Sequence, residues 1–386
     1  MNDKTPNIRF KGFTDDWEQR KLTEFVEFFS GLTYTPNDVQ KNGTLVLRSS
    51  NVSNGEVVDA DNVYVNPQVV NSENVKVGDI VVVVRNGSRS LIGKHAQIKA
   101  IMPNTVIGAF MTGIRSECPA FTNALLNTSR FEEEIAMNMG ATINQITGYM
   151  FSKMEFKVPC LDEQKKIGEY FEKLDNLITL HQRKHDQLLN IKKSMLEKMF
   201  PKNGEKAPKI RFDGFTDDWE QRKVSEIADR FDNLRVPVAA NLRIPGNTPY
   251  YGANGIQDYV EGYTHDGEYI LVAEDGVNDL KNYPVNYVNG RIWVNNHAHA
   301  FQGKEKIAEN KFLSYAMSRA DIESFLVGGG RAKLNADIMM NLDITLPSFT
   351  EQAKIGEYFS NLDNLITLHQ QNEFILKKAI SWLVLH

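Results

Sequence analysis

The chain has 386 residues, of which 41% are hydrophobic and 24% are charged. This composition is typical of a globular protein with two or three domains, and it excludes a wholly disordered, collagen-like or membrane-embedded chain. The formal net charge is −5 and no segment is a polybasic arm, so contact with nucleic acid would depend on local patches or on a partner.

The first residues, MNDKTPNIRF, contain no apolar run behind a basic stretch. No apolar run in the chain approaches the roughly 20 residues that a membrane span needs, so we expect neither an export signal nor a membrane anchor. The two cysteines, Cys118 and Cys160, allow at most one disulfide bond and cannot form a four-thiolate metal site. These features predict a protein of the reduced cytoplasm.

Two stretches of sequence occur twice. IRFKGFTDDWEQRK at residues 8–21 recurs at 210–223 with one difference in 14 positions, and the 20 residues at 163–182 recur at 351–370 with three differences. The segments that they enclose show no comparable similarity. Repeated frames around dissimilar inserts indicate one structural task performed twice, with inserts that do related tasks differently. Recent duplication followed by drift is the alternative, although drift would blur frames and inserts alike, and a solenoid would need shorter, uniform repeats.

The predicted elements follow the order domain, helix, domain, helix. Residues 1–160 contain short β-branched runs separated by Gly, Asn and Pro, with a helical patch near 120–139, and predict a first mixed domain. Residues 161–200 predict a long helix, residues 201–350 a linker and a second mixed domain, and residues 351–386 a second long helix. The predicted fold class is α+β, with two globular mixed α/β domains separated by a pair of long antiparallel helices in a pseudo-two-fold internal repeat.

Both long helices carry apolar residues at alternating spacings of four and three, the pattern of a helix that buries one stripe against another helix. Neither helix can bury its stripe alone, so we expect the two to pack together. The predicted seam positions are Ile167, Phe171, Leu174, Ile178 and His181 in the first helix and Ile355, Phe359, Leu362, Ile366 and His369 in the second. We interpret the two histidines as polar positions that set the register, and not as metal ligands or catalytic groups.

No stretch of the sequence predicts a catalytic or metal site. The segment from Gly87 to His95 resembles a phosphate-binding loop, but five residues separate its glycines and His95 stands where Ser or Thr would bind Mg²⁺. The stretch 162–165, DEQK, resembles the end of a nuclease motif, but the second copy lacks the lysine, so we interpret its acidic residues as helix-capping groups. His297 and His299 have no third metal ligand nearby in sequence, and we expect a hydrogen-bonded or surface role for both.

Both domains contain loops that mix a few cations with amide side chains, the groups that contact phosphates and base edges. Each loop alone is also explained as a solvated turn, but their recurrence in both halves favours nucleic-acid recognition by the set. The candidate DNA-binding residues are Arg85, Asn86, Arg89, Lys94, Asn144 and Gln145 in the first domain and Tyr250, Tyr251, Asn254, Asn296, Arg331 and Lys333 in the second. Two such domains on a stiff spacer could contact half-sites about one duplex turn apart, roughly 34 Å.

The repeated frames resemble those of the DNA-specificity subunits of type I restriction-modification systems, over essentially the whole chain. Each domain opens with a matching motif, and a second motif enters each long helix. These motifs are Trp17-x₃-Lys21-Leu22-x-Glu24, Trp219-x₃-Lys223-Val224-x-Glu226, Pro159-x-Leu161-x-Glu163-Gln164-x₂-Ile167 and Pro347-x-Phe349-x-Glu351-Gln352-x₂-Ile355. Neither motif is diagnostic alone, but two copies of each in alternating order are specific. One departure follows Gln370, where QNEFILKKAISWLVLH differs from the corresponding part of the first helix.

The resemblance implies two target-recognition domains that read a split double-stranded DNA sequence, one half-site per domain, in a chain that is not itself an enzyme. It also implies two modification subunits that methylate adenine, and ATP-dependent restriction subunits, as partners. S-adenosylmethionine, ATP and Mg²⁺ would then be bound by those partners and no cofactor by this chain. The leading alternative is a non-catalytic protein-binding adaptor with two interaction domains on a helical spacer, and an independent DNA-modifying enzyme is less favoured still.

Overall fold

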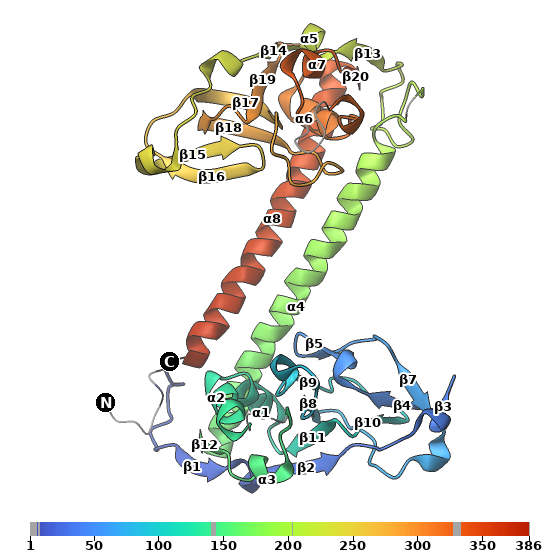
Figure 1. The fold of residues 1–386 in the computed structure, drawn as a ribbon, viewed down its shortest axis with the longest axis vertical. Coiled ribbons are helices and arrows are strands. Elements are labelled where there is room, and N and C mark those ends of the chain that lie inside the picture. Colours follow the sequence, from blue (N-terminus) through green and yellow to red (C-terminus); the bar gives the residue numbers. More distant parts are fainter. Residues whose placement is uncertain (1–5, 7, 140–143, 203, 327–332, 386) are drawn as a thin grey trace. The chain divides into compact units, whose positions relative to one another are not determined.

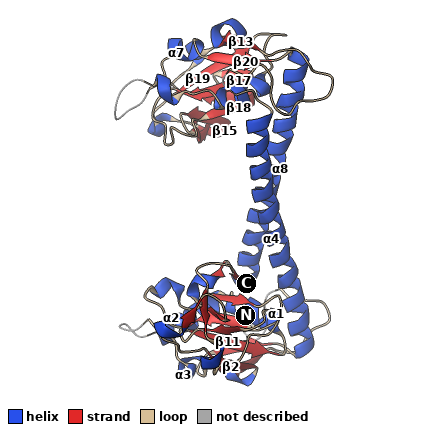
Figure 2. Cartoon of the chain, turned by 90° about the vertical axis from the view of Figure 1, so that its right-hand side faces the viewer, coloured by secondary structure: helices blue, strands red, loops and turns tan. Residues whose placement is uncertain are grey.

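The computed structural model describes residues 6, 8–139, 144–202, 204–326 and 333–385 (Figure 1). The contacts divide the chain into two units, Met1–Gln182 with Gln371–His386, and Arg183–Gln370. Each unit contains one mixed domain and a segment of each long helix. Figure 2 shows that strands and short helices are confined to the two domains. This organisation agrees with the predicted fold class.

The first domain is built on an antiparallel sheet in the order β2-β11-β8-β9. All four residues of the central strand β8 (Ile80–Val83) are buried, and successive side chains point to opposite faces of the sheet. Ile80 and Val82 lie in a core with helices α1 (Pro119–Leu126) and α2 (Ser129–Asn138), whereas Val81 and Val83 lie in a second core. The other strands are β2 (Val26–Ser30), β9 (His95–Gln97) and β11 (Met111–Ser116).

A second sheet of the first domain has the order β10-β4-β7-β3, and residues of β4 and β10 close the second core. Its strands are β3 (Val39–Gln40), β4 (Thr44–Leu47), β7 (Val63–Val65) and β10 (Thr105–Ile107), with β10 parallel to β4. The domain also contains the pairs β1 (Glu18–Lys21) with β12 (Glu155–Val158) and β5 (Val52–Ser53) with β6 (Glu56–Val57), and helix α3 (Gly148–Phe151).

The second domain repeats this central sheet and extends it. Its six strands have the order β14-β19-β17-β18-β15-β16, so that β14, β19, β17 and β18 repeat the order and the antiparallel pairing of β2, β11, β8 and β9. The strands are β14 (Ala228–Arg230), β15 (Pro245–Gly252), β16 (Gly255–Val260), β17 (His265–Ala273), β18 (Val285–Val294) and β19 (Ala298–Gly303). The domain also contains helices α5 (Val224–Ile227), α6 (Asn310–Ser318) and α7 (Ala336–Met340) and the pair β13 (Glu220–Lys223) with β20 (Asp343–Leu346).

The two repeated frame sequences meet in each unit through a buried ion pair. Arg9 donates two hydrogen bonds to Glu163, both 2.7 Å long, and the Glu163 side chain is fully buried. Arg211 binds Glu351 in the same way, at 2.7 and 2.8 Å. This corrects our interpretation of Glu163 as a helix-capping group, because its carboxylate joins the N-terminal frame to the long helix. The acidic residue that makes 162–165 resemble a nuclease motif therefore has a structural role, in the ion pair with Arg9.

The long helices are α4 (Leu161–Lys198) and α8 (Phe349–Leu385), and the two units share them. Within the second unit, Leu188, Met195 and Leu196 of α4 pack against a core that contains residues of α8. Lys192 of α4 lies 2.5 Å from Asp363 of α8. Figure 1 shows that these segments of α4 and α8 run in opposite directions.

The predicted seam residues are partly or fully buried. In α8, Ile355, Phe359, Leu362 and Ile366 are buried and His369 is half-buried, and the first three belong to the core of the second domain. In α4, Ile167, Phe171, Leu174, Ile178 and His181 are half-buried, and Ile167 packs against the core of the first domain. The start of each stripe is therefore buried against its own domain, which the spacing alone did not reveal. The pairing of the remaining positions stays a prediction.

Candidate nucleic-acid interface

In the first domain, the end of strand β8 is joined to the segment before helix α3. The Ile146 N–H donates to the Val84 carbonyl at 2.8 Å, and Arg85 forms an antiparallel bridge with Gln145. The structure thus brings together two groups of predicted residues, Arg85 with Asn86 and Asn144 with Gln145, that are about 60 residues apart in the sequence. Because β8 is buried on both faces, it provides a rigid base for this loop.

Two asparagines shape the loop in the first domain. The Asn86 amide donates to Ser49 Oγ at 3.1 Å and its oxygen accepts from the Ser88 N–H at 2.9 Å. The Asn144 amide donates to the Gly87 carbonyl at 3.0 Å. These bonds hold the loop in one conformation, although they also occupy amide groups that we predicted to be available for base contacts.

The predicted cations of the first domain carry no ion pair among the described residues. The Arg85 guanidinium lies 5.1 Å from the centroid of the exposed Phe110 ring, an arrangement that favours a cation–π contact. Arg89 is exposed in a short 3₁₀-helix, and the half-buried Lys94 accepts a backbone hydrogen bond from Val83. The first domain therefore presents three cations around one loop. The Gly87–His95 segment contains this 3₁₀-helix in place of the α-helix that follows a phosphate-binding loop.

In the second domain, the end of strand β17 has the same connection. The Leu334 N–H donates to the Glu274 carbonyl at 2.8 Å, and Asp275 forms an antiparallel bridge with Lys333. The Lys333 ammonium lies 2.7 Å from Glu274 Oε1, so this predicted cation is already paired. Arg331 lies outside the described residues.

The three predicted residues of the β15–β16 hairpin have different environments. Tyr250 is 1% exposed, and its hydroxyl accepts from the Val238 N–H at 2.9 Å, so it supports the hairpin and does not face a ligand. Tyr251 is half-buried, and burial raises the pKa of its hydroxyl. Asn254 is exposed and its amide donates to the Gly276 carbonyl at 2.8 Å, which connects the hairpin to the loop after β17.

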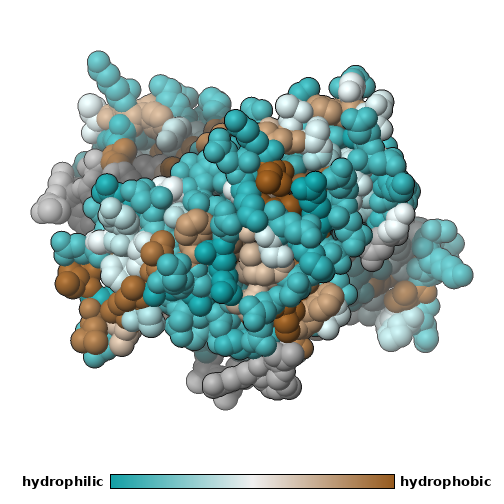
Figure 3. All heavy atoms as spheres, turned by 90° about the horizontal axis from the view of Figure 1, so that it is seen from above, coloured by the Kyte–Doolittle hydropathy of each residue, from teal (hydrophilic) through white to brown (hydrophobic). Residues whose placement is uncertain are grey.

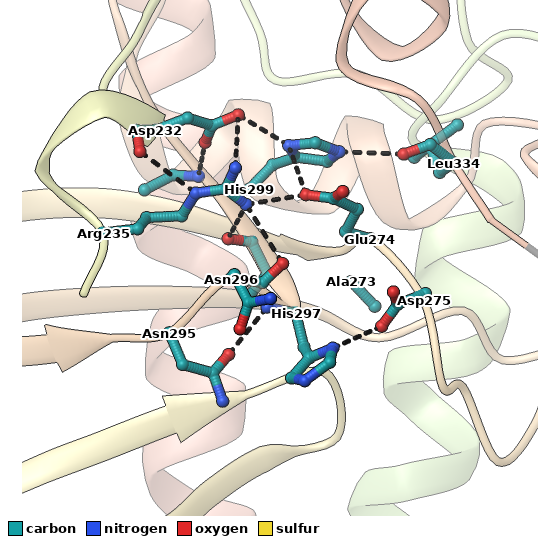
Figure 4. A network of polar contacts seen from close by, with 12 residues as sticks. Asp232, Arg235, Ala273, Glu274, Asp275, Asn295, Asn296, His297, His299 and Leu334 are labelled. Atoms are coloured by element: carbon teal, nitrogen blue, oxygen red, sulfur yellow. Dashed lines mark hydrogen bonds and ion pairs between the residues drawn. The ribbon is translucent and has the colours of Figure 1, made fainter. Parts of the chain in front are cut away.

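A buried polar network lies beneath these loops (Figure 4). His299 donates through Nε2 to the Leu334 carbonyl at 2.9 Å, and its Nδ1 lies 2.7 Å from Asp232 Oδ2. Arg235 donates to Glu274 at 2.7 Å and to the Ala298 carbonyl at 3.0 Å. The network joins the start of β19, the end of β17 and the Leu334 segment, so it fixes the loops that carry the candidate residues.

Two carboxylates of this network have lowered pKa values. Burial alone would raise the pKa of Asp232, but hydrogen bonds from His299 and Ala300 and the nearby Arg235 lower it overall. Burial likewise opposes ionisation of Glu274, whereas hydrogen bonds from Lys333 and Arg235 lower its pKa. Both groups are therefore held as carboxylates at neutral pH.

We expect Glu274→Gln to destabilise the second unit at neutral pH, and to do so less as the pH falls. The folded-state pKa of Glu274 lies below its unfolded value of about 4.3, so its contribution is complete above that pH and is lost as the pH falls through the folded value. Urea unfolding of both chains between about pH 6 and pH 3 measures this difference. A difference that does not change with pH would contradict a role for the ionised carboxylate.

The exposed face of the second domain includes two further residues beside this network. Asn296 is exposed, and its carbonyl lies 3.5 Å from Arg235. His297 donates through Nδ1 to Asp275 at 2.5 Å. Among the residues that the structure describes, no three His, Cys, Asp or Glu side chains are placed to hold a metal ion. His297 and His299 are both hydrogen-bonded, as we expected from the sequence.

Sequence reasoning missed Phe110 and Asp275 as parts of these loops. The offset of 188 between the second frame sequences places Gln145 against Lys333, but Arg85 and Asp275 are 190 residues apart, so no constant offset aligns the strand ends. A signal was present in the sequence, because Arg85 directly follows a run of aliphatic residues and Asp275 follows a similar run after one intervening residue, Glu274. Figure 3 shows that polar residues cover most of the visible face, with hydrophobic residues in smaller separate groups.

Comparison with known proteins gives a consistent result. The sequence model of one protein family, the type I restriction modification DNA specificity domain, matches residues 14–190 and again residues 216–377. The two matches together cover most of the chain. A putative type I restriction enzyme specificity subunit of Haemophilus influenzae is 43% identical over 146 residues, which are 38% of each chain. The type I restriction enzyme MjaVIII specificity subunit of Methanocaldococcus jannaschii is 22% identical over 62% of each chain. The matches thus span less than two thirds of either relative's length.

A solved structure has the same fold. The S subunit of a type I restriction-modification system from M. genitalium matches with a TM-score of 0.68 over 98% of each chain, at 15% sequence identity. At this identity the match supports the architecture and not individual residue roles. Among the described residues, none of the helices has both the length and the apolar composition that crossing a bilayer requires.

Proposed function

Because this chain belongs to the type I restriction modification DNA specificity family, we propose that it is the sequence-reading subunit of a complex that methylates and restricts DNA. It reads a bipartite target in double-stranded DNA, one half-site per domain. It works in the cytoplasm, holds two adenine-methylating modification subunits and associates with ATP-dependent restriction subunits.

One backbone scaffold occurs twice and carries different side chains each time, and this observation supports the proposal most strongly. The central sheet, the connection from the end of its buried strand and the Arg–Glu ion pair are the same in both units. The side chains on that scaffold differ, with Arg85 in the bridge of the first domain and Asp275 in the equivalent bridge of the second. A protein that reads two unlike half-sites needs such an arrangement. The side chains that contact bases must differ between the two domains, while the same backbone scaffold holds them in equivalent places within each domain.

In the first domain, Arg85 contacts the bases of the half-site, and Arg89 and Lys94 contact phosphates. The loop that carries these cations is lined by three amide residues, Asn86, Asn144 and Gln145. Free arginines form bidentate contacts with guanine, and lysines contact phosphates. In the second domain, Asn254 and Asn296 are exposed and are suited to contact DNA, whereas Lys333 is half-exposed but already paired with Glu274. The net charge of −5 fits a complex in which the partners supply much of the phosphate contact.

The chain itself is not an enzyme in this proposal, and it binds no cofactor. Its nuclease-like stretch is occupied by the ion pair between Arg9 and Glu163. S-adenosylmethionine, ATP and Mg²⁺ belong to the modification and restriction subunits.

Mapping of methylated adenines in a genome, with and without this chain, tests the proposal. We expect one bipartite motif with a fixed gap to lose methylation when the chain is deleted. If every methylated motif persisted, the proposal would fail and the protein-binding adaptor would be favoured.

We expect Arg85→Ala to weaken binding of the assembled complex to its mapped target roughly tenfold to hundredfold, because a bidentate arginine contact is lost. Competition with duplexes altered in one half-site at a time measures this effect, which should be confined to one half-site. Arg20→Ala is a matched control, since Arg20 belongs to the same unit but is engaged with Glu24 outside these loops. If complexes with Arg85→Ala and Arg20→Ala bound the target with equal affinity, Arg85 would not be one of the residues that contact bases.

A further inference from the structure

Two pairs of side chains occupy the same backbone position in the two domains. The Val84 N–H donates to the Phe110 carbonyl at 3.0 Å in the first domain, and the Glu274 N–H donates to the His297 carbonyl at 2.9 Å in the second. Val84 and Glu274 also accept the equivalent bonds from the Ile146 and Leu334 N–H groups, both at 2.8 Å. The next residues, Arg85 and Asp275, form the equivalent bridges.

The two pairs have opposite chemistry. In the first domain, the Arg85 guanidinium lies over the Phe110 ring, and Phe110 is 56% exposed. In the second domain, Asp275 accepts from His297 Nδ1, and these side chains are 33% and 47% exposed. The same place on the scaffold therefore presents a hydrogen-bond donor, Arg85, in the first domain and an acceptor, Asp275, in the second. Figure 4 shows Asp275 and His297 of the second domain.

One oxygen of Asp275 is available to a ligand. Oδ1 accepts from His297, and Oδ2 has no partner among the described residues. The adjacent Glu274 differs, because Arg235 and Lys333 both bind it and only 12% of its side chain is exposed. Phosphates repel a carboxylate, so Asp275 adds nothing to general DNA affinity and can contribute only where a base offers a donor.

In the major groove, only cytosine N4 and adenine N6 are exocyclic amino donors. We propose that Asp275 accepts a hydrogen bond from the amino group of one base in the half-site read by the second domain, and that His297 positions its carboxylate. Arg85, at the equivalent place, requires the acceptor atoms of guanine in the other half-site. This inference rests on the proposed function and extends it to the base chemistry that each domain selects.

Duplexes that lack single amino groups test the inference. The mapped target is prepared with 2-pyrimidinone in place of each cytosine, or with purine in place of each adenine, one position at a time. We expect one of these changes, in one half-site, to weaken binding by the wild-type complex roughly tenfold to hundredfold. The same change should leave the affinity of the Asp275→Ala complex unaltered, because the acceptor is already absent. The type of analogue that acts distinguishes cytosine from adenine.

His297 is tested by substitution with a side chain that keeps the donor. Asparagine can place its amide near the position of Nδ1, so we expect His297→Asn to retain the sensitivity to the missing amino group and His297→Ala to lose most of it. If binding by each variant still depends on the sequence of the half-site read by the first domain, the variant is folded. Arg85→Ala should change the base preference in that half-site only.

Three outcomes would overturn the inference. The first is that no amino-deficient duplex weakens the wild-type complex, and the second is that Asp275→Ala is as sensitive as wild type at every position. The third is that the wild-type complex does not prefer the mapped duplex to a scrambled one, and only this result also overturns the proposed function.

Discussion

Replacement of Arg211 by alanine is expected to destabilise the second unit by roughly 3–5 kcal/mol, because it leaves a buried carboxylate without its partner. The Glu351 side chain is fully buried and Arg211 supplies both of its charge-assisted hydrogen bonds. The pair also joins the frame sequence before the second domain to the helix after it. Its loss should therefore loosen β13 and β20, which pair between these two points.

Urea unfolding of the full chain measures this loss, and hydrogen exchange localises it to the second unit. Arg222→Ala is the matched control, since Arg222 forms an exposed pair with Glu220 that should contribute about 1 kcal/mol or less. Adding Glu351→Gln to Arg211→Ala should recover part of the stability, because a neutral amide costs less to bury than an unpaired carboxylate. Equal stabilities of Arg211→Ala and Arg222→Ala would show that the buried ion pair does not stabilise the second unit more than an exposed pair does.

The order of elements could be predicted from the sequence because it depends on local patterns. The spacing of apolar residues predicted helices at 161–200 and 351–386, and the structure has them at Leu161–Lys198 and Phe349–Leu385. The near-identical frames likewise predicted two equivalent units. Periodicity could not show that Ile355, Phe359 and Leu362 belong to the core of the second domain, because a helical stripe does not specify what covers it.

The candidate site was predicted only in part, because it depends on contacts between distant segments. Residue types in loops pointed to Arg85 and Gln145, which the structure places in one bridge. The same reasoning selected Tyr250, whose hydroxyl binds Val238 inside the domain, because a tyrosine in a glycine-rich segment looks alike whether it is buried or exposed. It missed Asp275, whose significance appears only when its backbone position is compared with that of Arg85.

The frame glycines provide a second test of the repeated scaffold. Gly168 and Gly356 occupy equivalent places in α4 and α8, where the N-termini of α1 and α6 approach closely. A Cβ at Gly168 would lie 2.6 Å from the Phe121 backbone nitrogen, and one at Gly356 would lie 2.9 Å from that of Phe312. At Gly356 it would also meet Glu309 Oε2 at 2.4 Å, the oxygen that accepts from the Phe312 N–H. Only glycine therefore allows these helices to pack as they do.

We expect Gly168→Ala and Gly356→Ala each to destabilise its own unit by about 1–3 kcal/mol, since overpacking forces backbone shifts. The better helix propensity of alanine offsets at most about 1 kcal/mol of this cost. Gly168→Ala should be the more severe, because its two nearest neighbours are backbone atoms, whereas the carboxylate of Glu309 can move if it gives up its bond to α6. Gly148→Ala is the control, as a Cβ there meets nothing within 4 Å. Thermal unfolding with hydrogen exchange separates the two units, and a Gly168→Ala chain as stable as Gly148→Ala would disprove the close approach of α1 to α4.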